Sequence, residues 1–174
     1  MRAAVELMLY LMDEAFDGAD EECLLSNIRS VGEAEWSLVP PGGSRSIREI
    51  VGHIAACKYM YDNHAFGDGG MTWEDPAGEL GVSMEDLQSR KLDPEPPMGA
   101  VVDWLKEGHR RLRQHIVQLD DADLGALRQP PEGAPRETRW IIANMIRHDD
   151  YHAGEINHLR ALVQGDDRWA WESG

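Results

Sequence analysis

Two histidines four residues apart, His148 and His152, are the residues whose types and spacing point most directly to chemistry. They lie in an amphipathic run from Thr138 to Val163 that has helical periodicity. Residues i and i+4 lie on one face of a helix, with Cβ atoms about 5–6 Å apart, so both imidazoles can bind one metal ion. A third histidine, His53, lies in a separate, partly apolar segment. The pattern predicts a buried metal site in a helical protein.

The histidine pair is predicted to face the protein interior. On a helical wheel at about 100° per residue it shares a narrow arc with Ile141, Met145, Glu155 and Leu159, whereas His158 falls outside that arc. Two imidazoles buried against each other would leave polar atoms unpaired, at about 1–3 kcal/mol each. A divalent cation removes this cost, because neutral imidazole is a common metal ligand. With His53 as a third ligand, such a site keeps an open coordination position.

Other residues are weaker candidates for this site. Cys57 lies one turn after His53 and is considered as a fourth ligand, although a small buried residue is the plainer interpretation. His109 lies close to an apolar stripe, and His64 is expected near solvent at a helix end. Trp73 lies in a long connection, where it could line a pocket mouth. The candidates for orienting the imidazole rings are Asn144, Asp149, Asp150 and Glu155.

Four principal helices are expected to position these residues. A capping box, Ser46 with Glu49, starts the second of them, which runs to about Phe66. The first spans Val5 to Phe16, with helix resuming from Glu21 to Val31, the third spans Met98 to Leu119, and the last ends near Gln164. No segment shows a convincing period of two, so the pattern predicts an all-α bundle.

A long connection, residues 67–97, separates the second and third of these helices. It contains four prolines and a short predicted helix from Ser83 to Arg90. Connections of this length are uncommon in compact domains unless they cross over a bundle or cover a site. We expect this segment to shape a substrate pocket.

Length and composition exclude several classes of protein. A chain of 174 residues is expected to form one domain, residues 1–174. The net charge of −15 and a pI near 4.7 argue against binding to nucleic acid or to an anionic membrane surface. No apolar run reaches the roughly 18 residues of a membrane helix, no signal peptide is apparent, and two cysteines make no disulfide framework. A cytoplasmic protein with a small-molecule substrate is the expectation.

Two ordered motifs resemble those of the DinB/YfiT-like superfamily. Residues 46–54, Ser-Ile-Arg-Glu-Ile-Val-Gly-His-Ile, are similar to its helix-two motif, and residues 148–156 are similar to its final-helix motif, His-x3-His-x-Gly-(Gln/Glu)-Ile. The resemblance implies a four-helix bundle with a long crossover connection between helices two and three. It also implies a divalent metal, zinc or nickel, held by His53, His148 and His152, and a homodimer. Cys57 and His109 lie outside the family's ligand pattern.

The resemblance also suggests classes of reaction. Its characterised members include mycothiol-dependent isomerases and bacillithiol transferases, in which the metal activates a low-molecular-weight thiol. The leading hypothesis is therefore a metal-dependent, thiol-using transferase or isomerase that acts on a small electrophile. One alternative is a hydrolase that uses metal-bound water, with Glu155 or a nearby aspartate as general base. Another is a non-catalytic, stress-related bundle that binds a metal.

Overall fold

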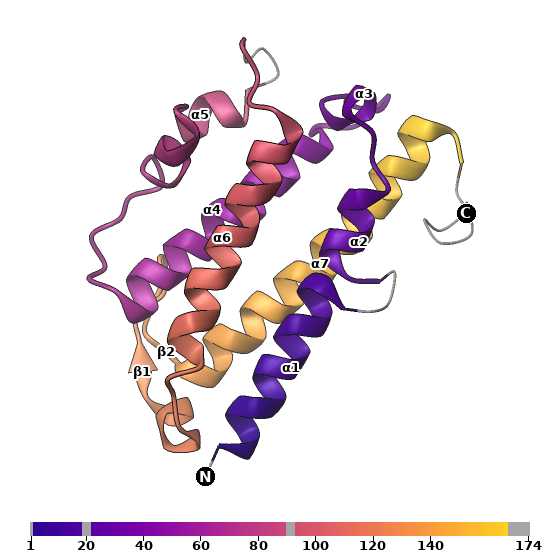
Figure 1. Cartoon of the computed structure of the whole chain (residues 1–174). Helices are drawn as coiled ribbons and strands as arrows, with labels where there is room; N and C mark the ends of the chain where they lie inside the picture. The colour runs from indigo at the N-terminus through magenta and orange to yellow at the C-terminus, as the bar shows by residue number, and fades with distance from the viewer. Residues whose placement is uncertain (1, 19–21, 90–92, 167–174) are drawn as a thin grey trace.

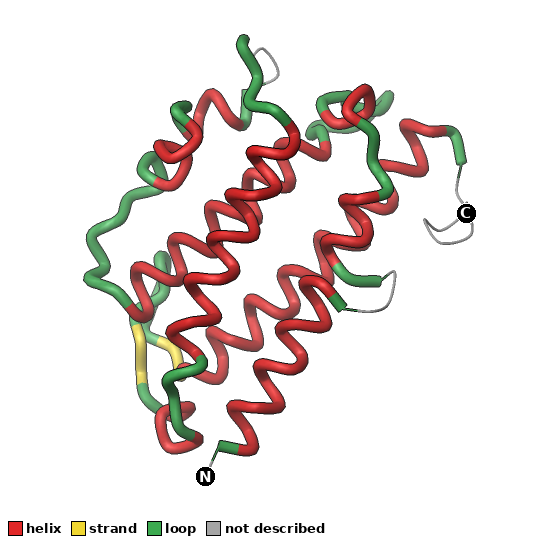
Figure 2. Tube along the Cα trace, viewed as in Figure 1, coloured by secondary structure: helices red, strands yellow, loops and turns green. Residues whose placement is uncertain are grey.

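The computed structural model describes residues 2–18, 22–89 and 93–166, and four long helices make up most of this part (Figure 1, Figure 2). They are α1 (Ala3–Asp17), α4 (Ile47–Phe66), α6 (Met98–Ile116) and α7 (Thr138–Gln164). The shorter elements are α2 (Leu24–Arg29), α3 (Glu33–Trp36), α5 (Met84–Leu87), the 3-10 helices η1 (Pro76–Leu80) and η2 (Asp121–Gly125), and the strands β1 (Leu127–Arg128) and β2 (Arg136–Glu137). The predicted all-α bundle is confirmed.

The four long helices do not simply alternate in direction. Figure 1 shows α1 and α7 running one way through the bundle and α4 and α6 running the other way. The helices α4 and α6 pack against each other, so the chain between two parallel neighbours has to return along the bundle. The connection over residues 67–97 makes this return and carries η1 and α5, as a crossover connection requires.

The helix that carries His53 begins where the sequence predicts. The Glu49 amide donates to Oγ of Ser46 at 3.3 Å, and Oε2 of Glu49 accepts from the Ser46 amide at 2.7 Å. At its far end, the amide of Gly67 donates to the carbonyl of Asn63 at 2.9 Å. A Cβ at position 67 would lie 2.8 Å from that same oxygen, so only glycine fits this close turn.

Several element boundaries differ from the predictions. The helix expected over residues 21–31 is the shorter α2, for which Cys23 in extended conformation is the N-cap, and Glu21 lies outside the described residues. The helix expected over 83–90 is α5, and Arg90 is likewise not described. The third long helix stops at Ile116, because the amides of residues 118 and 119 bond three residues back and tighten the chain. The two-residue strands β1 and β2 are too short for a period of two to show.

Buried apolar side chains fill the bundle in two groups. One lies mainly between α2, α4, α5 and α6, and the other between α1, α6 and α7. Close approach of α6 to α4 depends on Gly108, where an added Cβ would lie 2.8 Å from Cε2 of Tyr59. Across the described ranges, no helix combines the length and the apolar character needed to cross a bilayer.

Candidate metal centre

Helices α4 and α7 bring the three predicted histidines together. Nε2 of His53, from α4, lies 3.3 Å from Nε2 of His148 on α7. The ring centroid of His152 lies 4.5 Å from that of His148 and 5.3 Å from that of His53. The two α7 rings share a helix face because they are four residues apart. Three imidazole rings from two helices therefore lie together where α4 packs against α7.

Burial favours the neutral form of all three imidazoles. Burial, and then the nearby His152, lower the pKa of His53. Burial lowers the pKa of His148 to about 3, with further contributions from His152 and His53. Burial also lowers the pKa of His152, although the hydrogen bond to Glu155 opposes this shift. Neutral imidazole is the form that binds a metal ion, so these rings are ready to act as ligands.

Glu155 orients the ring of His152. Nδ1 of His152 donates to Oε2 of Glu155 at 2.7 Å, because a carboxylate can only accept. The other carboxylate oxygen accepts from Nη2 of Arg45 at 2.8 Å. With the proton on Nδ1, the lone pair of Nε2 on His152 is free. Glu155, considered in the sequence both as a ring-orienting residue and as a general base, has both oxygens engaged here.

The remaining candidates for orienting the rings bond elsewhere. Asn144 donates from Nδ2 to the hydroxyl of Tyr61 at 3.2 Å. Asp149 accepts from Nζ of Lys58 through both of its oxygens, each at 2.7 Å. Asp150 is exposed. Glu155 is therefore the candidate that contacts a histidine of the centre.

A divalent cation fits these residues. Nδ1 of His148 is buried and has no hydrogen-bond partner among the described residues, so protein groups leave this imidazole incompletely paired. Nε2 of His148 in turn faces a nitrogen of His53 across 3.3 Å. Two neutral imidazoles at this distance share at most one proton, whereas a cation between them would use both lone pairs.

Cys57 lies beside the histidines and competes with His152 as the third ligand. The ligand atoms of His53, Cys57 and His148 lie within 4.8 Å of one another, a group that does not include His152. Sγ of Cys57 lies 3.7 Å from Nε2 and 3.8 Å from Nδ1 of His53. Burial raises the pKa of Cys57 to about 12, so without a metal the thiol stays protonated and would have to lose a proton to bind one. We favour His152 as the third ligand because its hydrogen bond to Glu155 already leaves Nε2 unprotonated.

The other histidines lie away from this centre. The ring of His109, on α6, stacks on that of Phe16 with centroids 3.7 Å apart, and burial lowers its pKa to about 2. His64 donates from Nε2 to the carbonyl of Met71 at 2.8 Å near the end of α4. His158 is exposed on α7, as its place on the helical wheel predicts.

His53 opens onto two cavities that the crossover connection helps to enclose. One, of about 560 Å³, is lined by His53, Trp73, Glu74, Met84, Glu85, Gln88 and Glu132. The other, of about 330 Å³, is lined by Arg45, Glu49, His53 and Gln88. Trp73 thus lies in a pocket wall, and its Nε1 donates to Glu132 at 3.1 Å. A small molecule in either cavity can therefore contact His53.

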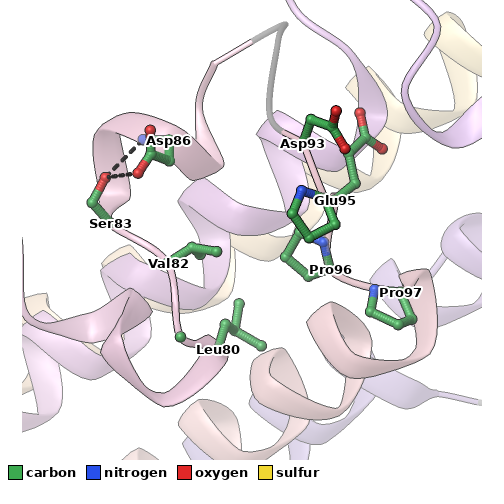
Figure 3. Close-up of a pocket in the computed structure, with 10 residues that line it drawn as sticks. Leu80, Val82, Ser83, Asp86, Asp93, Glu95, Pro96 and Pro97 are labelled. Carbon is green, nitrogen blue, oxygen red and sulfur yellow. Dashed lines mark hydrogen bonds between the residues drawn. The ribbon is translucent and has the colours of Figure 1, made fainter.

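A larger hollow of about 820 Å³ lies within the crossover connection itself (Figure 3). Its lining comes from residues 80–83, Asp86 and residues 93–97, with Oγ of Ser83 turned toward Asp86. It contains none of the histidines. We therefore place the candidate site in the smaller cavities that His53 lines.

The fold and the histidine cluster together define a helical bundle with a site that could hold a metal ion. The chain belongs to the DinB superfamily, whose family model matches residues 20–156. The match includes both histidine motifs. A comparison with curated proteins found no match.

Sequence reasoning missed one buried pair next to the centre, Lys58 with Asp149. Both side chains are 0% exposed. A signal was present, because Lys58 lies four residues after Ile54, and Asp149 four residues after Met145, on apolar faces. A charged residue in an apolar stripe predicts a buried partner, although spacing alone does not say which one.

Proposed function

We propose that this protein is a metal-dependent enzyme that uses a low-molecular-weight thiol for transferase or isomerase chemistry on a small electrophile. The observation that carries the proposal is the clustering of three imidazoles, two from α7 and one from α4, with His53 in the wall of a cavity. Three protein ligands leave a coordination position for a further molecule, as in catalytic rather than structural zinc sites.

His53, His148 and His152 would hold a zinc or nickel ion. Such an ion lowers the pKa of a thiol that coordinates it, and so makes the thiol a better nucleophile at neutral pH. Glu155 keeps the ring of His152 in one tautomer and one orientation. Gln88, which lines both cavities, and Trp73 offer a hydrogen-bonding group and a flat apolar surface to the substrate.

The charges of the larger cavity restrict the substrate. Three carboxylates, from Glu74, Glu85 and Glu132, line it, and no lysine or arginine is among the lining residues in the described part of the chain. These carboxylates repel an anionic substrate, so a neutral or cationic electrophile is favoured. The hydrolase alternative needs a general base, and Glu155, with both oxygens engaged, is poorly placed for that role.

Metal content tests the proposal first. Elemental analysis of purified protein should find about one zinc or nickel per chain, as three imidazole ligands predict. His53→Ala, His148→Ala and His152→Ala should each lose most of it. His158→Ala, on an exposed part of α7, is the matched control and should keep it. Cys57→Ser should also keep it, and loss in this variant would instead make Cys57 the third ligand.

Thiol binding tests the second half of the proposal. Cobalt-loaded protein should change its visible spectrum when a low-molecular-weight thiol is added, because a sulfur ligand would enter the open position. Turnover of small electrophiles should then require both metal and thiol. Metal binding with no response to any thiol, and hydrolysis of esters without one, would support the hydrolase. Metal binding with no turnover of either kind would support a non-catalytic metal protein.

A further inference from the structure

The side chains of Lys58 and Asp149 form an ion pair at the centre of the bundle. Nζ of Lys58 lies 2.7 Å from each oxygen of Asp149, and both side chains are fully buried. The pair links α4 to α7, the two helices that carry the candidate metal ligands. Lys58 directly follows Cys57 on α4, and Asp149 directly follows His148 on α7.

All four long helices contact this pair or its neighbours. Nζ of Lys58 lies 5.0 Å from the centroid of the Phe16 ring on α1. The imidazole of His109, on α6, stacks on the same Phe16 ring with centroids 3.7 Å apart. The ammonium group is therefore held by a carboxylate from α7 and an aromatic ring from α1, so its position is tightly restricted.

Stability alone does not account for this pair. Removing two charges from water is costly, and apolar side chains of similar volume often stabilise a core as well or better. A buried ion pair instead restricts the two helices that carry it to one arrangement, because any shift that separates the charges leaves both unpaired. In helical assemblies the best-attested use of such buried polar groups is to select one register.

The metal site depends on one relative position of α4 and α7. Each residue turns a helix by about 100°, so a slip of one residue between α4 and α7 would turn the imidazoles away from each other. The apolar contacts around them are non-directional and tolerate small slips better than a two-oxygen ion pair does. Asp149 directly follows His148, and Lys58 lies five residues after His53, so a restraint on the pair is transmitted through at most about one and a half helical turns.

We propose that Lys58 and Asp149 are positioning residues that hold α4 and α7 in the register at which His53 meets His148 and His152. This inference rests on the metal centre of the proposed function, but not on any reaction carried out there. The pair acts through the helices and does not itself bind the metal.

The test replaces the pair by apolar residues of similar size. Purified Lys58→Met, Asp149→Leu and the double variant are compared with the wild-type protein in urea unfolding and in Co²⁺ binding. Each single variant leaves one buried charge unpaired and should unfold at lower urea concentration. The double variant should recover most of that loss. It should nevertheless bind Co²⁺ at least about 10-fold more weakly, with a changed visible spectrum, because ligand geometry sets affinity.

A matched control is available at the surface. Arg113 on α6 contacts both oxygens of Asp13 on α1, at 2.7 and 2.8 Å, and neither helix carries a candidate ligand. The double variant Arg113→Met with Asp13→Leu should leave Co²⁺ affinity and spectrum unchanged. If the interior double variant also binds Co²⁺ with wild-type affinity and spectrum, the proposal is wrong.

A third variant keeps the test decisive if the apolar double variant does not fold. Lys58→Arg retains the charge but changes the reach and shape of the cation, so it should alter the Co²⁺ spectrum and weaken binding. An unaltered spectrum in this variant would overturn the proposal. Absence of Co²⁺ binding by the wild-type protein would instead overturn the metal centre of the proposed function, which distinguishes the two failures.

Discussion

A single residue can decide which nitrogen of an imidazole is free to bind a metal. For His152 the decision comes from Glu155, whose carboxylate accepts the proton on Nδ1 and so leaves Nε2 unprotonated. Arg45 holds the same carboxylate from the other side at 2.8 Å. Nδ1 of His148 has no partner among the described residues, so no hydrogen bond at that atom selects its tautomer.

Glu155→Gln should weaken metal binding. The amide can still accept from Nδ1 of His152 but lacks the charge that raises ligand basicity, so affinity is expected to fall about 10- to 100-fold. Competition with a chromophoric chelator measures this. Arg45→Met is the matched control, since it removes the other partner of Glu155 and leaves the bond to His152 in place. Equal affinity in Glu155→Gln and wild type would mean that Glu155 does not support the ligand.

His109 should make the metal-free protein sensitive to acid. Burial lowers its pKa from 6.5 to about 2, so below pH 6.5 the unfolded chain takes up a proton that the folded chain does not. The free energy of unfolding therefore falls as pH drops from 6.5 toward 2, by up to about 1.4 kcal/mol per pH unit for one such group. His109→Phe keeps the stack on Phe16 and should show a shallower decline.

Urea unfolding in the presence of a chelator, at pH 7.5 and at pH 4.5, measures the effect of His109. The buried histidines of the metal centre change the free energy of unfolding with pH in the same direction in the wild type and in His109→Phe. The difference between these two proteins therefore isolates His109. The same loss of stability in both proteins would show that His109 takes up its proton equally in the folded and unfolded states.

At the scale of elements, the helix that carries His53 is held from two sides. Because Gly108 has no side chain, α6 approaches α4 so closely that the ring of Tyr59, on α4, occupies the space that a Cβ at position 108 would need. On another side, the buried guanidinium of Arg48 donates to the carbonyls of Leu87 and Ser89, each at 2.6 Å, and so ties α5 to the start of α4. The second contact fixes part of the crossover connection close to the cavities that His53 lines.

Gly108→Ala should destabilise the bundle despite the better helix propensity of alanine. The new Cβ would lie 2.8 and 2.9 Å from two ring carbons of Tyr59, which is itself buried and stacked on Trp104. Overpacking of this kind costs about 1–3 kcal/mol, against a propensity gain of about 1 kcal/mol. Gly154→Ala, on an exposed part of α7 with no atom within 4 Å, should instead be neutral or stabilising. Thermal unfolding compares the two variants. Equal stability of Gly108→Ala and Gly154→Ala would show that α6 can move away from Tyr59 at little cost.

At the scale of the whole molecule, the direction of the helices creates the site. Because α4 and α6 run the same way, the chain has to return between them, and the returning segment lies over the bundle (Figure 1). That segment supplies Trp73, Met84 and Gln88 to the wall beside His53. A bundle in which every helix alternates in direction could use short loops and would leave these imidazoles without such a wall.

The parts of this protein that depend on neighbouring residues along the chain were predictable from the sequence. The capping box at Ser46 sets the start of α4, and the four-residue spacing of His148 and His152 puts both rings on one helix face, because backbone hydrogen bonding fixes the turn of a helix. The inward face of each long helix could likewise be read from its apolar period. These local features are enough to predict an all-α bundle and a histidine pair inside it.

Which helix faces meet, and in which register, was decided only by the tertiary structure. Spacing could not show that Lys58 pairs with Asp149, that Arg48 binds the end of α5, or that Glu155 is shared with Arg45, since these partners are 39 to 110 residues apart. The sequence suggested Cys57 only as a possible fourth ligand, whereas in the structure its Sγ lies within 4.8 Å of the ligand atoms of both His53 and His148. Helix periodicity specifies directions around one axis, whereas distances between axes arise from packing of the whole core.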